Sequence, residues 1–248
     1  MMILERESTI LGGPPVSSEI PATEPNPRAR LAEAKRELYR AAIVAAAEAV
    51  FAEQGYEAAR VQSIAKRAGV SLATFYGVFP GKWDAFRAVQ QDRLGALMLE
   101  VGTLVMNASD AFDRLRFGLE GYLRYHMDHR AFLQIQLRER VPWGTIDELR
   151  TPEQTRAWET GLQLLIAAFR EAMTAGLLEH DDAESCARTA TAMSQVRMVM
   201  WVDRGMTDDP AEVARAAMLQ FVRTFARAEQ VDVLSARVRD APMPPKLE

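Results

Sequence analysis

RVQSIAKRAGVSLATFYGVF, residues 60–79, contains two short helical patterns with a glycine between them. In the first pattern apolar residues recur at helical spacing, and Gly69 then ends the run with a residue that tolerates a left-handed backbone. Ser71 is a good N-cap for the second helix, which buries Phe75 and Phe79. The side chains that then face outward are Leu72, Ala73, Thr74 and Tyr76. A helix-turn-helix presents its recognition helix to the DNA major groove in this way.

The distribution of charge supports this interpretation, although the chain of 248 residues has a net charge of −4. Residues 28–87 contain ten Lys or Arg and six Asp or Glu, a net charge of +4. The leader before them carries −3 and the remainder of the chain −5. A basic N-terminal module on an acidic body is typical of a DNA-binding head on a body that does not bind DNA.

Composition favours an ordinary globular protein, with 48% hydrophobic and 26% charged residues. The single cysteine, Cys186, can form neither an intrachain disulfide nor a cysteine-based zinc site by itself, which fits a reducing compartment. The sequence contains no apolar run long enough to span a bilayer, and residues 1–27 lack the order of a signal peptide. We therefore expect a cytoplasmic protein without a membrane partner.

Residues 51–79 together with Lys82 resemble the DNA-binding domain of the TetR family of bacterial transcriptional regulators, over roughly residues 36–90. Hydrophobic, glycine and polar positions agree with the family in order and spacing. The resemblance implies an all-α, two-domain protein that dimerises and binds a near-palindromic operator, with release usually caused by a small molecule. The matching positions are Phe51, Gly55, Tyr56, Val61, Ile64, Ala65, Ala68, Gly69, Val70, Ser71, Thr74, Tyr76, Phe79 and Lys82.

The expected fold is all-α, with a helix-turn-helix DNA-binding domain followed by a larger helical ligand-binding and dimerisation domain. A first helix over about 31–54 supports the helix pair, and a long helix over about 82–106 connects the head to the body. We expect a disordered leader over 1–27, the head over 28–80, the body over 81–231 and a flexible tail over 232–248.

The sequence departs from the family pattern within the head. Arg60 stands where the family often has Thr, and Leu72 where Lys is frequent, so some customary phosphate contacts are missing. Arg60 can replace one of them as a charged donor at the start of a helix, while Tyr76 and Lys82 match the family's phosphate contacts directly. Direct base reading looks sparse, because Leu72 and Ala73 offer only apolar contact. The candidate DNA-binding residues are Arg60, Gln62, Ser71, Leu72, Ala73, Thr74, Tyr76 and Lys82.

The last two long helices, over about 182–204 and 209–231, carry more apolar surface than a small body needs. In the resembling family these helices pair with their copies as a four-helix dimer interface. An apolar stripe does not say whose surface it meets, so an intrachain core face is the alternative. The candidate interface residues are Ser194, Met200, Trp201, Ala217 and Phe221.

The central helices supply aromatic and isolated polar groups of the kind expected in a largely apolar ligand cavity. This composition favours an aromatic or lipophilic effector over a highly charged one. The candidate ligand-binding residues are Tyr122, His126 and Trp158, followed by Phe117 and Gln195.

Other chemistry has weaker support in the sequence. His126 and His129 are three residues apart, but two histidines make an incomplete metal site. Cys186 and His180 lack an identifiable orienting group, and a small buried cysteine explains the position better. We therefore expect no enzyme, metal or cofactor. The alternative function is a helical enzyme or small-molecule-binding protein in which the helix-turn-helix is only architectural, and the basic head disfavours it.

Overall fold

The computed structural model describes residues 26–138 and 151–240, and these parts of the chain are helical without named strands. The expected all-α fold is confirmed. The head contains α1 (Pro27–Gln54), α2 (Val61–Arg67), α3 (Leu72–Val78) and the start of α4 (Lys82–Met106). The body adds α5 (Ala111–Asp128), α6 (Arg130–Arg138), α7 (Pro152–Thr174), α8 (Ala183–Asp203), α9 (Pro210–Phe225), a 3-10 turn η1 (Ala228–Gln230) and α10 (Val231–Asp240).

The turn between α2 and α3 has the predicted chemistry. Gly69 has φ of 68°, in the left-handed region where a side chain would be strained. Ser71 caps α3 by accepting a hydrogen bond from the Thr74 backbone N–H at 3.0 Å. The predicted burial of Phe75 and Phe79 is confirmed, so the opposite side of α3 is left for solvent or a partner.

The core of the head continues past residue 80. Phe51 and Phe75 are fully buried in a cluster that also contains Phe86 and Val89 of α4 and Ile135 of α6. Two ion pairs hold α1 against α4: Arg93 to Glu48 at 2.8 Å and Arg40 to Asp92 at 2.9 Å. The head therefore shares its packing with two helices of the body.

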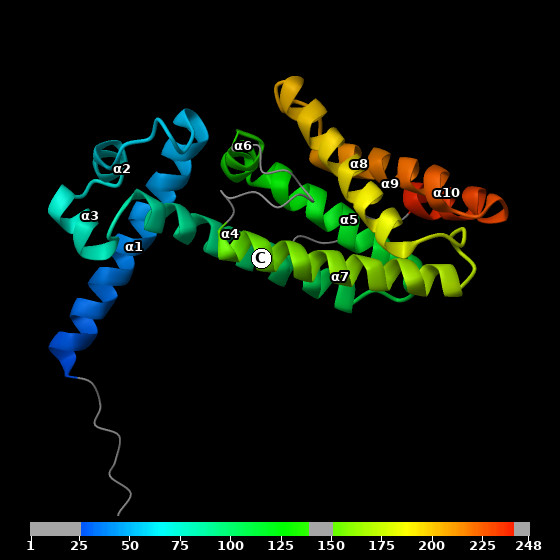
Figure 1. Ribbon diagram of the computed structural model, residues 1–248, viewed down its shortest axis with the longest axis horizontal. Coiled ribbons are helices and arrows are strands. Elements are labelled where there is room, and N and C mark those ends of the chain that lie inside the picture. Colours follow the sequence, from blue (N-terminus) through cyan, green and yellow to red (C-terminus); the bar gives the residue numbers. More distant parts are fainter. Residues whose placement is uncertain (1–25, 139–150, 241–248) are drawn as a thin grey trace, which may run out of the picture.

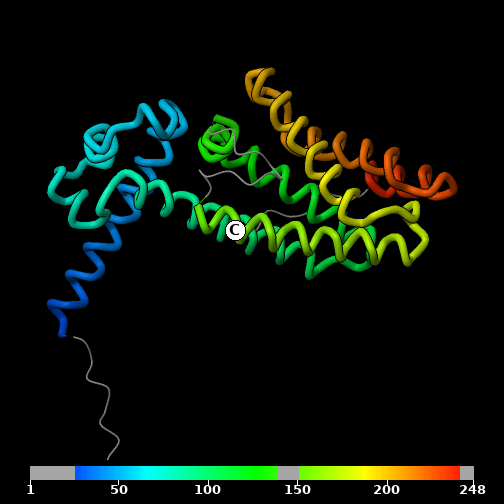
Figure 2. The backbone as a smooth tube through the Cα atoms, viewed as in Figure 1, coloured from blue at the N-terminus to red at the C-terminus, as the bar shows by residue number. Residues whose placement is uncertain are grey.

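α4 is the physical link between the two ends of the molecule. Figure 1 shows it leaving the head at the left and running into the body beside α7. The tube in Figure 2 shows α8 and α9 farther along the body, with α10 at the end away from the head. The largest hydrophobic cluster of the described residues lies in the body, where it joins α5, α7, α8 and α9. Within it Phe169 is 0% and Phe221 2% exposed.

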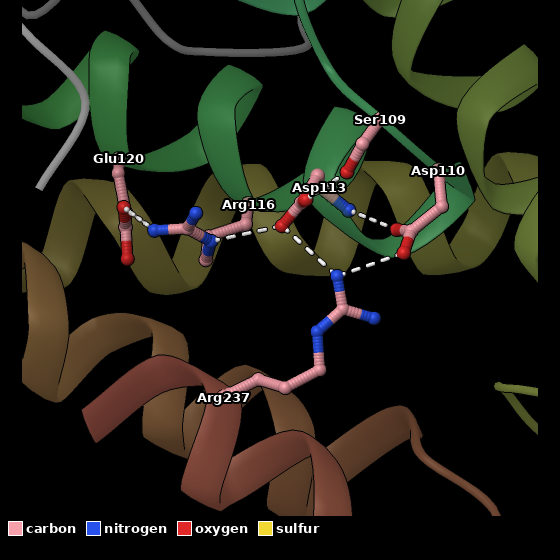
Figure 3. A network of polar contacts seen from close by, with 6 residues as sticks. All are labelled: Ser109, Asp110, Asp113, Arg116, Glu120 and Arg237. Atoms are coloured by element: carbon pink, nitrogen blue, oxygen red, sulfur yellow. Dashed lines mark hydrogen bonds and ion pairs between the residues drawn. The ribbon is translucent and has the colours of Figure 1, made fainter. Parts of the chain in front are cut away.

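The predicted flexible tail over 232–248 is wrong for its first part. Residues 231–240 form α10, whose Leu234 and Val238 are 1% exposed in the body core. Arg237 of α10 also contacts the start of α5, at 2.8 Å from Asp110 and 3.1 Å from Asp113 (Figure 3). The three prolines that suggested a flexible segment all follow residue 240, outside the described residues.

The start of the first helix is also earlier than predicted. α1 begins at Pro27, where Asn26 accepts a hydrogen bond from the Arg28 backbone N–H at 3.0 Å. The proposed leader falls almost entirely on residues outside the described part of the chain. Of the helices that the structure describes, none combines the length and apolarity needed to cross a membrane.

Candidate nucleic-acid interface and effector cavity

The outer face of α3 is accessible. Leu72 is 41% and Tyr76 54% exposed, and Ala73 is also exposed. Thr74 is half-buried, and its hydroxyl lies 2.8 Å from the Ser71 hydroxyl, so the cap restrains the only hydroxyl of the predicted base-reading group. α3 therefore offers mostly apolar surface to a groove.

Two further predicted DNA-binding residues lie on α2 and its boundary. Arg60 is exposed at the N-cap position, and Gln62 is exposed in the first turn. Lys66, which the sequence analysis missed, is exposed one turn farther along, whereas Arg67 pairs with Glu53 at 2.7 Å. Exposed cations on a short helix before the recognition helix suit contacts to phosphates.

Lys82 has a structural role that its sequence position did not indicate. Its ammonium group donates to the carbonyl oxygens of Tyr56 at 2.6 Å and Glu57 at 3.2 Å, and it lies 4.3 Å from the Tyr56 ring centroid. These contacts fasten the start of α4 to the turn after α1. An ammonium has three N–H donors, so two carbonyl partners leave one for a phosphate.

A cavity of about 210 Å³ lies in the body between α4, α5, α7 and α8. Its wall brings together Tyr122, His126 and Trp158, the three residues ranked first from the sequence. Phe117 and Gln195 do not line it: each directly neighbours a lining residue, Gly118 or Ser194, and one residue turns a helix by about 100°.

Sequence analysis did not predict most of the residues that line the cavity, because it assigned α4 only the role of a connecting helix. Small residues inside helices were the available signal: Gly102, Gly118 and Gly161 all line the cavity. The remaining lining is mainly apolar, and the residues from α4 and α7 are Leu94, Leu97, Met98, Val101, Val105, Ala157, Leu162, Leu164, Leu165 and Ala168.

His126 is an uncharged group in this wall. It is 1% exposed, and burial lowers its pKa to about 4. Its Nδ1 lies 2.9 Å from the Tyr122 carbonyl oxygen, which can only accept, so Nδ1 carries the proton and Nε2 is an acceptor. Burial also raises the pKa of Tyr122, whose ring centroid lies 4.5 Å from that of His126.

Three glutamines meet at the end of the cavity nearest the head. Gln136 donates to the Gln90 side-chain oxygen at 2.8 Å, and Gln154 donates to the Gln136 side-chain oxygen at 3.4 Å. Gln154 is itself held by the capping box of α7, where it accepts from the Thr151 backbone N–H at 2.8 Å. This glutamine cluster, Gln90, Gln136 and Gln154, therefore joins α4, α6 and α7.

An ion pair lies beside the glutamine cluster at the start of α7. Arg87 of α4 contacts Glu153 at 2.8 Å, and its hydrogen bond is the main reason that the pKa of Glu153 falls to about 2. The carboxylate is thus charged at neutral pH. Together with the glutamines it connects the cavity end of α7 to the part of α4 that packs in the head.

The structure corrects part of the predicted dimer surface. Trp201 is 1% exposed, with its indole N–H donating to the Asp208 carbonyl at 2.8 Å, and Phe221 is 2% exposed in the body core. Ser194 is buried on the cavity wall. These side chains meet their own chain, the alternative that an amphipathic stripe leaves open. Among the predicted residues, Met200 is 39% exposed and Ala217 is half-buried.

The histidines and the cysteine form no multi-residue site in the described part of the chain. His129 is bonded through Nδ1 to the Tyr125 carbonyl oxygen at 2.8 Å, and the described residues contain no group of three or more His, Cys, Asp or Glu able to hold a metal ion. Cys186 is buried, which raises the pKa of its thiol, whereas His180 is exposed. This arrangement offers no activated nucleophile.

Glu120 has an ionisable side chain that is buried in the core of the body. It is 1% exposed and lies 3.3 Å from Arg116 (Figure 3). Burial outweighs this arginine and raises the pKa of Glu120 to about 7. The group faces the α8 and α9 side of the body and does not line the cavity between α4, α5, α7 and α8.

Comparisons with known proteins agree with this architecture. Residues 43–89 match the family model described as bacterial regulatory proteins, tetR family. A curated relative, the HTH-type transcriptional activator FasR of Mycolicibacterium smegmatis, is 33% identical over 90 residues. That match covers 36% of this chain and 41% of the relative, so the chain spans less than half the length of the relative it matches.

Solved structures extend the agreement to most of the chain. The transcriptional regulator FadR from Bacillus subtilis, in complex with stearoyl-CoA, is 17% identical with a TM-score of 0.61, covering 79% of this chain and 97% of its own. The ketosteroid transcriptional regulator KstR2 of Mycobacterium tuberculosis is 16% identical with a TM-score of 0.61, covering 76% and 95%. A Shewanella sp. PV-4 protein assigned to the tetR family is 18% identical with a TM-score of 0.60, covering 76% and 98%.

At these identities the solved structures establish the fold, while the family model identifies the DNA-binding domain within residues 43–89. The helix-turn-helix, the long α4 and the helical body all lie where that fold requires them. Residues 43–89 thus match the DNA-binding domain of the bacterial TetR family of regulatory proteins, and the whole described chain has the fold of the solved regulators.

Proposed function

We propose that the protein is a dimeric transcriptional repressor that binds a palindromic operator and is released by a small apolar or aromatic effector. The observation that carries this proposal is the position of the cavity. Its wall includes α4, and the start of the same helix packs in the core of the DNA-binding head. A ligand in the body thereby contacts the element that orients the recognition helix.

Contact with DNA is assigned to the exposed face of α3 and the cations around it. Arg60, Tyr76 and Lys82 are the proposed phosphate contacts, because each presents a donor near the recognition helix. Leu72, Ala73 and Thr74, with Gln62, are left for base edges or for the shape of the groove. Because α3 presents few polar groups, we expect much of the sequence specificity to come from the shape of the DNA.

Dimerisation is assigned to the outer faces of α8 and α9. Val196, Val199 and Met200 of α8 are 58%, 41% and 39% exposed, which leaves an apolar strip on the surface of one chain. Ala217 of α9 supplies a small residue that permits close approach. A two-fold dimer sets its two recognition helices in successive major grooves, about 34 to 36 Å apart or a multiple of that.

Regulation requires the effector to prefer one spacing of the heads. A ligand shifts the equilibrium only by its differential affinity, and each tenfold preference is worth about 1.4 kcal/mol. The mainly apolar wall supports a lipophilic effector, as do a structural relative that holds stearoyl-CoA and one named for ketosteroids. The M. smegmatis relative is named an activator, so a reporter assay has to score either sign of regulation.

The test is selection of bound DNA from a genomic pool, followed by binding measurements at several salt concentrations. Arg60→Ala should weaken all sequences similarly and lower the slope of log affinity against log salt by about 1. Arg239→Ala is the matched control, because Arg239 is an exposed arginine on α10, at the end of the body away from the head. A chain that selects no DNA sequence would refute the proposal and favour a helical binding protein.

A further inference from the structure

The glutamine cluster contains N–H donors that the bonds within the cluster leave unused. Each of the three side-chain amides carries two N–H donors, and the bonds within the cluster use one donor of Gln136 and one of Gln154. Gln90 is 0% exposed, and its amide nitrogen has no acceptor among the described residues. A buried donor without a partner costs about 1 to 3 kcal/mol, so the cluster favours an added acceptor.

Two of the three glutamines lie on the cavity wall, and the third, Gln90, is bonded to one of them, Gln136. Gln136 and Gln154 both line the cavity, and both are 6% exposed. His126, on the same wall, is neutral and offers no positive charge. The cavity wall at the end nearest the head is therefore polar, buried and uncharged.

The charged residue of the described wall, Arg114, lies at the end of the cavity away from the head, and its charge is neutralised by an ion pair. Arg114 precedes His126 by twelve residues on α5, a rise of about 18 Å along the helix. Its guanidinium is paired with Glu171 of α7. A carboxylate or phosphate that reached the glutamines would have no free cation beside it in the described wall, and burying an unpaired charge is strongly unfavourable.

We propose that the glutamine cluster is the recognition point for an uncharged carbonyl oxygen of the effector, as in an ester, lactone or ketone, whose apolar remainder extends between α4 and α7. This inference rests on the proposed effector cavity. The carbonyl accepts from the second amide N–H of Gln136, which lies on the cavity wall. The length of wall on α7, from Gln154 to Ala168, is about 21 Å and suits an extended apolar chain.

The site also explains how such a group is sensed. The bond from Gln136 to Gln90 ties α6 to α4, and both helices contribute to the head core through Ile135 and Val89. A carbonyl that accepts from the second N–H of the Gln136 amide draws this side chain toward the cavity and so strains the tie. An alkane of equal length fills the cavity without reaching the tie, so binding and sensing are separable.

The experiment compares three probes with the same chain: methyl decanoate, decanoate and decane. Their affinities are measured calorimetrically on the full chain at neutral pH and without DNA. Wild type should prefer methyl decanoate to decanoate. In the double variant Gln90→Leu/Gln136→Leu the ratio of methyl decanoate affinity to decane affinity should fall about tenfold, as expected for one lost hydrogen bond.

The double variant replaces both partners of the buried bond by apolar groups, which is milder than removing one. Gln163→Leu, an exposed glutamine of α7, is the matched control and should keep the wild-type ratio. If the double variant does not fold, Gln136→Leu alone decides by the same ratio, since it removes the donor that lies on the cavity wall. An unchanged ratio in a variant that still binds decane, or tighter binding of decanoate than of its ester, overturns the inference.

Failure of this inference is distinguishable from failure of the proposed function. A chain that selects no operator but shows the glutamine-dependent ester preference loses the regulatory role and keeps the recognition point. A chain that releases its operator with a lipophilic effector but shows no such preference keeps the role and loses the recognition point.

Discussion

Ile135 gives the sharpest test of how the body is connected to the head. It lies on α6, outside the helix-turn-helix in sequence, yet its side chain is 1% exposed in the head core. Ile135→Ala removes buried methyl and methylene groups and leaves a cavity, which costs about 2 to 5 kcal/mol of unfolding free energy. For a chain of this size each kcal/mol lowers Tm by about 2 to 4 °C, so we expect a decrease of about 4 to 20 °C.

The assay is thermal unfolding followed by calorimetry and by a probe of the head, such as protection of a selected operator. Val233→Ala on α10 is the control, because Val233 is 57% exposed and its truncation should change stability by less than about 0.5 kcal/mol. The reasoning is refuted if Ile135→Ala unfolds at the wild-type temperature. It is also refuted if the head unfolds separately at an unchanged temperature, since a shared core requires the two to lose stability together.

Two further predictions concern the body. Burial raises the pKa of Glu120 from its ordinary 4.5 to about 7, so its protonation stabilises the fold fully below about pH 4.5, and this contribution is lost as pH rises through 7. In denaturant titrations Glu120→Gln should therefore reduce the change in unfolding free energy between pH 5 and 8 by up to about 3 kcal/mol. A variant with the same pH dependence as wild type would contradict this prediction. Gly161→Leu should abolish binding of methyl decanoate, because a Cβ at Gly161 meets nothing within 4 Å and the leucine side chain would fill the cavity. Gly95→Leu is the control, since Gly95 is equally unobstructed but lies on the exposed surface of α4, and this variant should bind as wild type does. An equal loss of binding in both variants would argue against the site.

Local chemistry explains what the sequence predicts well. A cap needs only a side-chain oxygen and the amide two or three residues later, so Ser71 could be identified from its neighbours. The left-handed turn at Gly69 is equally local. The family pattern in the head combines such local features, which is why its residues could be matched one by one.

Contacts between distant segments were not predictable in the same way. Trp201 and Phe221 lie on apolar stripes, and only the packed chain reveals that its own core takes them up. Lys82 was placed correctly at the start of α4, but its carbonyl partners come from a turn 25 and 26 residues earlier. The three glutamines lie far apart in sequence, so their meeting depends on how α4, α6 and α7 pack.

The glycines of the cavity wall have a consequence for how the size of the cavity can change. Gly102, Gly118 and Gly161 come from three different helices, and a Cβ at Gly102 or Gly161 would enter open space rather than a packed contact. A single glycine-to-alanine or glycine-to-valine exchange can therefore shorten or narrow the cavity while the surrounding core stays in place. Successive exchanges of this kind offer an evolutionary route from a long cavity to a shorter one that leaves the surrounding helices and the head in place.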